Sequence, residues 1–112
     1  MSRTPPIDPM RGNSVAAGGF KTRFLGDIVA EMTAFFDIAD SERVRAGGLH
    51  LELTGDDVTE CLGGSLPLGE SDLPRRYLTH CDPRLNETQA LELAAEAARL
   101  MRRRTRPASR AA

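Results

Sequence analysis

Only one segment of the chain has the two-residue alternation of a β-strand, and this limits what the chain can fold into. Between Leu49 and Thr54, three leucines alternate with His50 and Glu52, a pattern that predicts a strand with one apolar face. A single strand cannot satisfy its own backbone hydrogen bonds. The sequence therefore predicts an α/β organisation that is incomplete by itself.

Two stretches with apolar residues at helical spacing flank this strand. The first runs from Lys21 to Ala39 and predicts a long helix. The second follows Asn86, which is placed as the N-cap of a helix, with Gln89 placed to complete a capping box; Pro107 closes the helical region. The first stripe comprises Phe24, Leu25, Ile28, Val29, Met32, Phe35, Phe36 and Ala39; the second comprises Leu91, Ala94, Ala95, Ala98 and Met101, widened by Leu93, Ala97 and Leu100.

The remaining segments are rich in proline and glycine. Residues 1–19 show no periodicity and are predicted to be a loop or a disordered lead-in. The segment Val58–Leu85 is longer than an ordinary connection, and such segments are functional or disordered. We therefore expect an ordered part over residues 20–104, followed by a disordered, arginine-containing tail over residues 105–112.

Charge and cysteine content exclude several classes of protein. With 15 basic and 16 acidic side chains the net charge is −1, so no global field attracts nucleic acid or a membrane. Six arginines follow Glu96; they suit a nucleic-acid patch or, more simply, the cation-favouring end of a helix. Two cysteines are too few for a disulfide framework, and no segment resembles a signal peptide or a membrane span of ~20 residues. We expect a reduced, cytoplasmic protein with no nucleic-acid or membrane partner.

Three places in the sequence are candidates for chemistry. Glu52 lies near the carboxyl end of the predicted strand, where ligand sites gather in parallel α/β sheets, although a solvent-facing edge explains the same alternation. Asp82 follows His80 and Cys81 and could join a metal site, although an aspartate before proline is a common turn former. The run 21–23 (KTR) could bind an anion at a helix start, although a solvated first turn explains it equally well.

Five motifs occur in the same order as in one known family. The chain resembles the class II (plant-type) 3-deoxy-D-arabino-heptulosonate 7-phosphate synthases, the DAHP synthases, from about Ile7 to Met101. The similarity covers the C-terminal end of the longer family subunit. The motifs are Asp8–Asn13, Gly19–Arg23, Gly47–Glu52 followed by Thr54-Gly55, Val58–Gly64 and Cys81–Asn86.

The resemblance implies a fold, a reaction and a metal. The fold is a TIM (β/α)8 barrel, of which this chain would supply about the last two helices and the final strand. The reaction joins phosphoenolpyruvate to erythrose 4-phosphate at the start of the shikimate pathway, and it depends on a divalent metal, manganese or cobalt. The family's glutamate and aspartate metal ligands fall on Glu52 and Asp82. Arg11 occupies the position of the histidine ligand, and a guanidinium cannot coordinate a metal.

Three interpretations of the chain follow. The first is the C-terminal portion of a DAHP synthase, a transferase by resemblance, which is either a truncated gene product or a partial sequence. As an isolated chain it would be inactive, bind metal weakly or not at all, and self-associate or receive its missing strands from a partner. The second is a non-catalytic interaction module that docks on a full-length synthase or another shikimate enzyme. The third is a nucleic-acid binder that uses the arginine-containing tail.

Overall fold

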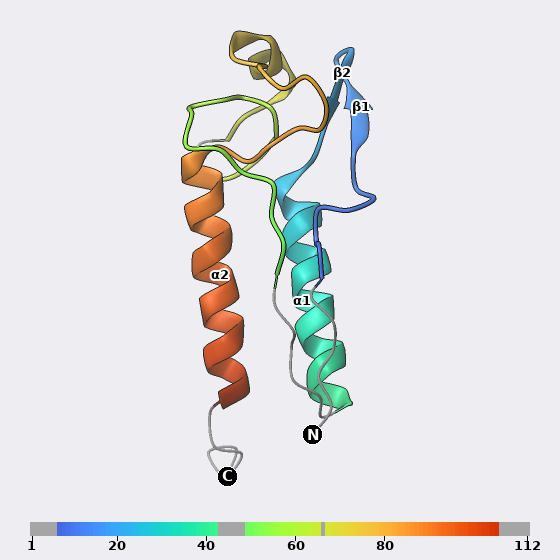
Figure 1. Cartoon of the computed structure of the whole chain (residues 1–112), viewed down its shortest axis with the longest axis vertical. Coiled ribbons are helices and arrows are strands. Elements are labelled where there is room, and N and C mark those ends of the chain that lie inside the picture. Colours follow the sequence, from blue (N-terminus) through green and yellow to red (C-terminus); the bar gives the residue numbers. More distant parts are fainter. Residues whose placement is uncertain (1–6, 43–48, 66, 106–112) are drawn as a thin grey trace.

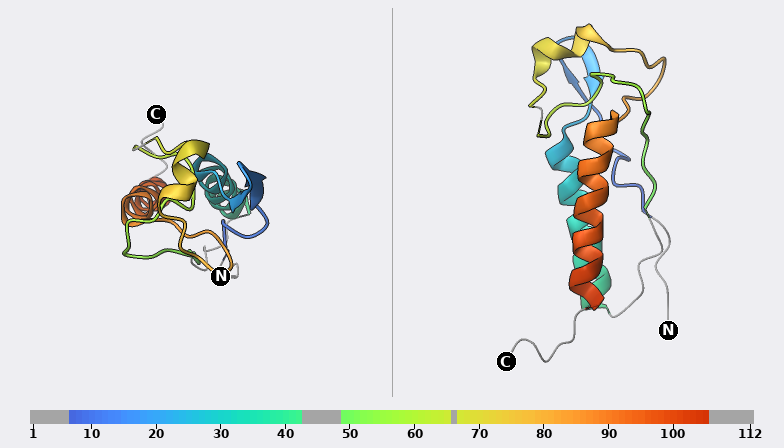
Figure 2. Two further views of the ribbon diagram at one scale, coloured as in Figure 1. Left: turned by 90° about the horizontal axis from the view of Figure 1, so that it is seen from above. Right: turned by 90° about the vertical axis from the view of Figure 1, so that its left-hand side faces the viewer.

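The computed structural model describes residues 7–42, 49–65 and 67–105. Two α-helices lie side by side and run in the same direction, and the loops gather at their amino ends (Figures 1 and 2). The result is a small α/β structure. Its elements are strands β1 (Val15–Ala17) and β2 (Phe20–Thr22), helix α1 (Leu25–Ser41), a 3-10 helix η1 (Glu70–Arg75) and helix α2 (Glu87–Thr105).

Strands β1 and β2 form an antiparallel hairpin that the sequence analysis did not predict. Ala17 pairs with Phe20, so Gly18 and Gly19 form the entire turn, with φ values of 57° and 82°. Positive φ at both central residues is the requirement of a two-residue type I′ turn. The expected loop over residues 1–19 therefore contains a strand. The helix expected from Lys21 begins only at Leu25, because β2 occupies the preceding residues.

The predicted strand over Leu49–Thr54 is extended, but it is not a regular strand. A parallel bridge joins Leu49 to Ile7, and a second joins Leu53 to Leu85. The N–H of Leu85 donates to the carbonyl of Glu52, and the carbonyl of Leu85 accepts from the N–H of Thr54. The segment thus lies between two parallel neighbours. Each contributes one bridge among the described residues, which is too little for a regular ladder.

The extended segments and the helices form two layers. The chain rises through residues 7–10 and 49–53 toward the loops, whereas α1 and α2 descend from them (Figure 1). The helices lie on one side of the extended segments in both further views (Figure 2). Alternation of extended segments in one direction with helices in the other is typical of βα units.

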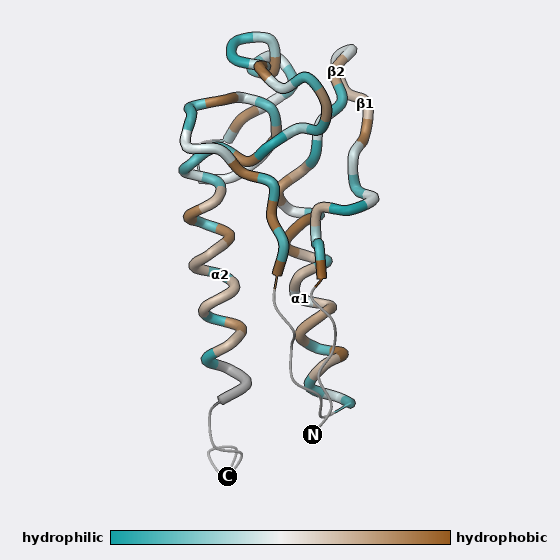
Figure 3. Tube along the Cα trace, in the orientation of Figure 1, coloured by the Kyte–Doolittle hydropathy of each residue, from teal (hydrophilic) through white to brown (hydrophobic). Residues whose placement is uncertain are grey.

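The core lies between the two helices and the extended segments. It confirms the apolar stripe of α1 except for Phe24, which precedes the helix and is 41% exposed. Apolar and polar residues alternate along both helices (Figure 3). The buried residues of α1 are Leu25, Ile28, Met32, Phe36 and Ala39. All of these except Ala39 pack in one cluster with Met10, Cys61, Leu85, Leu93, Ala97 and Leu100, and Leu49 and Leu51 lie partly buried against it.

The predicted core face of α2 is wrong. Leu91 and Met101, which begin and end the predicted stripe, are 64% and 56% exposed. The residues that were expected only to widen the stripe, Leu93, Ala97 and Leu100, are buried instead. Alanines of α2 lie on several sides of this helix, so its apolar periodicity fits two neighbouring faces. Packing against α1 selects the face that carries Leu93 and Leu100.

The capping box at the start of α2 is confirmed. The Asn86 side-chain oxygen accepts from the Gln89 backbone N–H at 2.9 Å, and the Gln89 side-chain oxygen accepts from the Asn86 N–H at 3.2 Å. The amide group of Gln89 also donates to the carbonyls of Cys61 and Gly63. These two side chains therefore fasten the start of the long segment Val58–Leu85 to α2. Of the predicted tail, only Thr105 lies within the described residues, as the last residue of α2.

Candidate functional site

The candidate site lies at the loop end of the molecule, beyond the amino ends of both helices (Figure 1). At this end the extended segment 49–53 leads into the loops, and β2 leads into α1. Both predicted metal ligands, Glu52 and Asp82, are held here by basic residues of the run 21–23. In parallel α/β folds ligands bind at this end, beyond the carboxyl ends of the strands.

Arg23 joins the two acidic segments. Its side chain is only 4% exposed; one guanidinium nitrogen, Nη2, lies 3.1 Å from Oε1 of Glu52. The other terminal nitrogen, Nη1, donates to the carbonyl of Pro83 at 2.6 Å. Its Nε is buried and has no hydrogen-bond partner among the described residues. One guanidinium therefore connects Glu52 to the residue that follows Asp82, so that the two predicted ligands share one neighbourhood.

Lys21 pairs with the second predicted ligand. Its Nζ lies 2.6 Å from Oδ1 of Asp82, and both side chains are about half exposed. The hydrogen bond and the charge of Lys21 lower the pKa of Asp82, and the same contacts with Asp82 raise the pKa of Lys21. Both groups are therefore ionised at neutral pH. An exposed pair of this kind contributes little to stability, so its importance is geometric.

Alternation along an extended chain explains why the run 21–23 supplies two cations to one face. Side chains at positions i and i+2 of a strand point to the same side. Thr22, between the two cations, is buried and donates its hydroxyl to the carbonyl of Glu60 at 2.7 Å. Both interpretations of this run, an anion site at a helix start and a solvated first turn, placed it at the start of a helix. That placement is wrong, because α1 begins at Leu25 with Phe24 as its N-cap.

A buried carboxylate, Glu60, organises the loop that carries Asp82. It is fully buried and accepts hydrogen bonds from the backbone N–H groups of Leu78, Thr79 and Arg84. The Arg84 guanidinium adds two more, at 3.0 and 2.9 Å. Burial raises the pKa of Glu60, but the hydrogen bonds from Arg84 and Leu78 outweigh it, and the net pKa is lowered.

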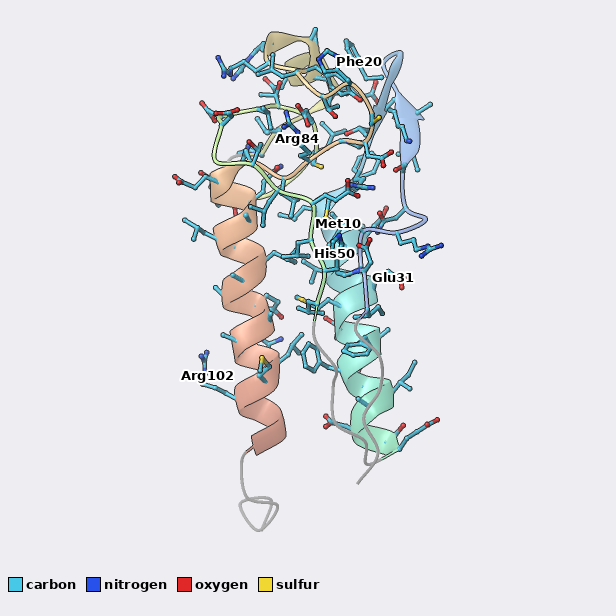
Figure 4. The ribbon with its side chains drawn as sticks, viewed as in Figure 1. Met10, Phe20, Glu31, His50, Arg84 and Arg102 are labelled. Carbon is cyan, nitrogen blue, oxygen red and sulfur yellow. The ribbon has the colours of Figure 1, made fainter. Side chains whose placement is uncertain are left out.

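An aromatic contact ties the same loop to the hairpin. The rings of Phe20 and Tyr77 are 4.8 Å apart, and the Tyr77 hydroxyl donates to the backbone carbonyl of Lys21. Figure 4 shows Phe20 and Arg84 among the loops, beyond the helix ends. Lys21 is thus positioned by its own strand and by the loop that carries its partner Asp82.

The other residues considered from the sequence lie outside these contacts. The Arg11 side chain is exposed, while its N–H donates to the carbonyl of Asp8. His50, His80 and Cys81 are exposed. Within residues 7–42, 49–65 and 67–105, no three His, Cys, Asp or Glu side chains lie together in a way that could hold a metal ion. Glu52 and Asp82 therefore bring two carboxylates to this end of the molecule, and no third such side chain joins them within the described ranges.

Sequence reasoning missed the partners of the two acids and the role of Glu60. Lys21 and Arg23 were singled out, but for a different purpose. Their alternation directly after the Gly18-Gly19 turn is the signal that could have placed them on one face of a hairpin strand. Nothing local marks Glu60, because its partners lie 18 to 24 residues further along the chain.

The architecture is that of an α/β protein built from βα units. The extended segments are parallel, the helices run the opposite way, and a polar site lies at the loop end that they share. The chain matches the model of the class-II DAHP synthetase family over residues 4–98, and it belongs to this family. No helix of the described residues is both long and apolar enough to cross a membrane.

Two curated relatives are similar to most of the chain. The chain is 56% identical over 88 residues to a phospho-2-dehydro-3-deoxyheptonate aldolase of Neurospora crassa. It is 52% identical over 88 residues to a protein of the same name from Streptomyces coelicolor. Each match covers 78% of this chain, but only 18% and 20% of the two relatives. The chain therefore matches about a fifth of the length of these relatives.

Proposed function

We propose that this chain forms part of the active site of a class II DAHP synthase, a transferase that condenses phosphoenolpyruvate with erythrose 4-phosphate. The chain would contribute Glu52 and Asp82 as two ligands of a divalent metal, manganese or cobalt. The observation that carries the proposal is the bridge made by Arg23, which holds Glu52 and the Asp82 loop together although they are distant in sequence. The compartment we propose is the cytoplasm, where this pathway enzyme would meet its substrates.

The donor chemistry of the two residues fits a hard divalent cation. Carboxylate oxygens suit manganese. Of the four carboxylate oxygens of Glu52 and Asp82, two, Oε1 and Oδ1, pair with a cation among the described residues. The second oxygen of each carboxylate is the atom we assign to the metal. When bound, the metal would act as a Lewis acid on the aldehyde of the sugar phosphate. Arg11, at the histidine position of the family motif, supplies no ligand, so affinity in this chain should be weak.

The basic residues of the site have a separate task in this proposal. Lys21 pairs with Oδ1 of Asp82 at 2.6 Å and thereby orients this carboxylate. Arg23 holds Glu52 from a buried position, so that this carboxylate keeps one orientation. Oriented ligands are what a metal site requires from its surroundings.

We also propose that the α/β arrangement is an arc of a (β/α)8 barrel. Three extended segments in parallel, at Ile7, 49–53 and Leu85, are covered by two parallel helices, as in consecutive βα units. A barrel of this type takes about 250 residues. The remaining strands would come from further residues of a longer chain, from self-association or from a partner.

A second candidate function is a non-catalytic module that docks on a full-length synthase or another shikimate enzyme. The observation that favours it is the exposed apolar face of α2, where Leu91 and Met101 are more than half exposed. Large apolar side chains gathered on one exposed face mark interaction sites more often than scattered ones do. This candidate needs no metal, and metal binding therefore separates it from the first.

Manganese binding to the purified chain tests the proposal. Water-proton relaxation should report weak binding that Glu52→Ala and Asp82→Ala each reduce, whereas Glu96→Ala, a charge-matched change on α2, leaves it unaltered. Arg11→His should strengthen the binding. Phosphate release from the two substrates by the isolated chain should not exceed the background without protein. Equal affinity in the wild type and in both carboxylate variants would show that the ligand assignment is wrong.

A graft tests the activity itself. The 88 matching residues of this chain would replace the corresponding residues of the Streptomyces coelicolor relative. We expect a grafted protein with Arg11→His to form product and one with Arg11 to be strongly impaired. Adding Asp82→Ala to the active graft should abolish turnover. A graft whose activity does not depend on Glu52 and Asp82 would contradict the proposed site.

A further inference from the structure

Asp82 has a defined position although it is only partly buried. Its side chain is 43% exposed, and the side chain of its partner Lys21 is 52% exposed. Exposed ion pairs contribute little to order by themselves. The position of Asp82 must therefore come from the backbone of the loop 78–84, which contains no helix or strand.

Glu60 supplies the hydrogen bonds that a sheet would otherwise give to this loop. Its Oε2 accepts from the N–H groups of Leu78 and Thr79 at 3.0 and 2.9 Å, before Asp82, and its Oε1 accepts from the N–H of Arg84 at 2.9 Å, after it. The loop is thereby held on both sides of Asp82. Within it, the Thr79 hydroxyl donates to the carbonyl of Asp82 at 2.8 Å.

Arg84 fixes the orientation of the Glu60 carboxylate. Its Nε and Nη2 donate to Oε1 and Oε2 respectively, in the two-pronged geometry that makes such pairs strong and directional. Glu60 itself is fully buried, so it cannot contact a metal or a substrate directly. Whatever it does for the site, it does through the loop.

We propose that Glu60 is a positioning residue of the site, which sets the loop 78–84 so that Asp82 meets Lys21 and points its free oxygen toward the metal. This inference rests on the proposed function for its metal, but the geometry it explains exists without metal. Loss of Glu60 should release Asp82 from Lys21 while the helices, which Glu60 does not contact through any described hydrogen bond, stay folded.

The Lys21 ammonium group offers a direct readout. Lys21 is the one lysine in the sequence, so its ammonium signal in a ¹H–¹⁵N spectrum of the labelled chain is unambiguous. We expect Asp82→Asn to shift this signal and speed its exchange with water, and Glu60→Gln to produce most of the same change. Glu96→Gln changes the net charge equally and breaks the Glu96–Arg99 pair on α2; it should leave the Lys21 signal unaltered.

A purely structural role of Glu60 predicts a different result. Glu60→Gln would then lower the melting temperature, but the folded fraction would keep the wild-type Lys21 signal. That outcome would overturn the proposal. A further change of the Lys21 signal when Glu60→Gln is added to Asp82→Asn would also overturn it, because Glu60 would then act on Lys21 by another route.

A second variant guards against loss of folding. If Glu60→Gln abolishes the helical circular dichroism, Arg84→Gln decides, because Arg84 is partly exposed and its removal leaves Glu60 the three backbone donors. We expect Arg84→Gln to move the Lys21 signal part of the way toward that of Asp82→Asn, with Arg99→Gln as the charge-matched control. An unchanged signal in Arg84→Gln would refute the proposal.

Manganese affinity separates this inference from the function on which it rests. Removal of a residue that orients a metal ligand weakens metal binding on the order of tenfold to a hundredfold. We therefore expect Glu60→Gln, made in the otherwise wild-type chain, to lower the manganese affinity by this factor. If the chain binds manganese without using Asp82, the proposed function fails, yet the Lys21 signal still tests Glu60. If Asp82 binds manganese and Glu60→Gln leaves both the affinity and the Lys21 signal unchanged, only the inference fails.

Discussion

Replacing Arg23 by methionine should loosen the connection between Glu52 and the Asp82 loop by a predictable amount. The buried hydrogen bond to the Pro83 carbonyl comes from a charged donor and is worth about 2 kcal/mol. The contact with Glu52 counts for about 1 kcal/mol, because that carboxylate is one-third exposed and is screened by water. Removing the unpaired Nε returns about 1 kcal/mol. The expected loss is about 2 kcal/mol, or about thirtyfold in an equilibrium constant.

Amide hydrogen exchange measures this loss where it occurs. The N–H of Leu85, which donates to the carbonyl of Glu52, should lose protection by about thirtyfold. Arg75→Met removes an exposed arginine paired with Asp72 and should change this protection less than threefold. Arg23→Lys should fall between them, because an ammonium keeps the charge but cannot reach both partners as a fork does. Equal protection of Leu85 in the Arg23 and Arg75 methionine variants would refute the reasoning.

Three further predictions concern local structure. Gln89→Met removes three hydrogen bonds, two of them buried, and should lower the protection of the first turn of α2 by about 3 kcal/mol. Thr88→Ala on the same turn should not; hydrogen exchange measures both. Gly19→Ala should destabilise the hairpin by about 1 kcal/mol, because its φ of 82° is unfavourable for alanine. Gly26→Ala, inside α1 with open space around it, should stabilise that helix by about 1 kcal/mol; hydrogen exchange in the two elements compares these effects. The pKa of Glu60 is lowered in the folded chain. Its contribution to stability is therefore complete above the ordinary carboxyl pKa of about 4.3 and is lost as the pH falls through the lowered value. The loop 78–84 should open in acid before the helices unfold, and simultaneous loss of the loop and the helices would contradict this.

Local signals predicted the helices well because their determinants lie within one or two turns. The spacing of Ile28, Met32 and Phe36 requires no knowledge of the partner, and the capping box needs only Asn86 and Gln89. The core face of α2 was misjudged for the opposite reason. Two faces of that helix carry enough apolar surface, and only the position of α1 decides between them.

The extended part of the fold could not be predicted in the same way. A hydrogen-bonded ladder depends on its neighbours, and the neighbours of 49–53 are Ile7 and Leu85, which have no strand pattern of their own. The Gly18-Gly19 pair is typical of a hairpin turn. The residues on either side of it do not alternate strongly, and the hairpin was therefore not predicted.

The candidate site was predicted in part. The family resemblance singled out Glu52 and Asp82, and the structure brings both segments to Arg23. The pairing of these acids with Lys21 and Arg23 was not predicted, because it depends on how a hairpin turns its side chains toward two distant loops.

The distances in sequence across the site also constrain the order in which the molecule can fold. Arg23 meets Glu52 over 29 residues and Pro83 over 60, and Lys21 meets Asp82 over 61. Closing loops of this length is slow compared with forming a helix. During synthesis, α1 can form as soon as it leaves the ribosome, but its preceding cations have no acidic partner until much later. The Asp82 loop and Leu85 must emerge before the layer and the site close together, so we expect assembly of the site to be the last and slowest step of folding.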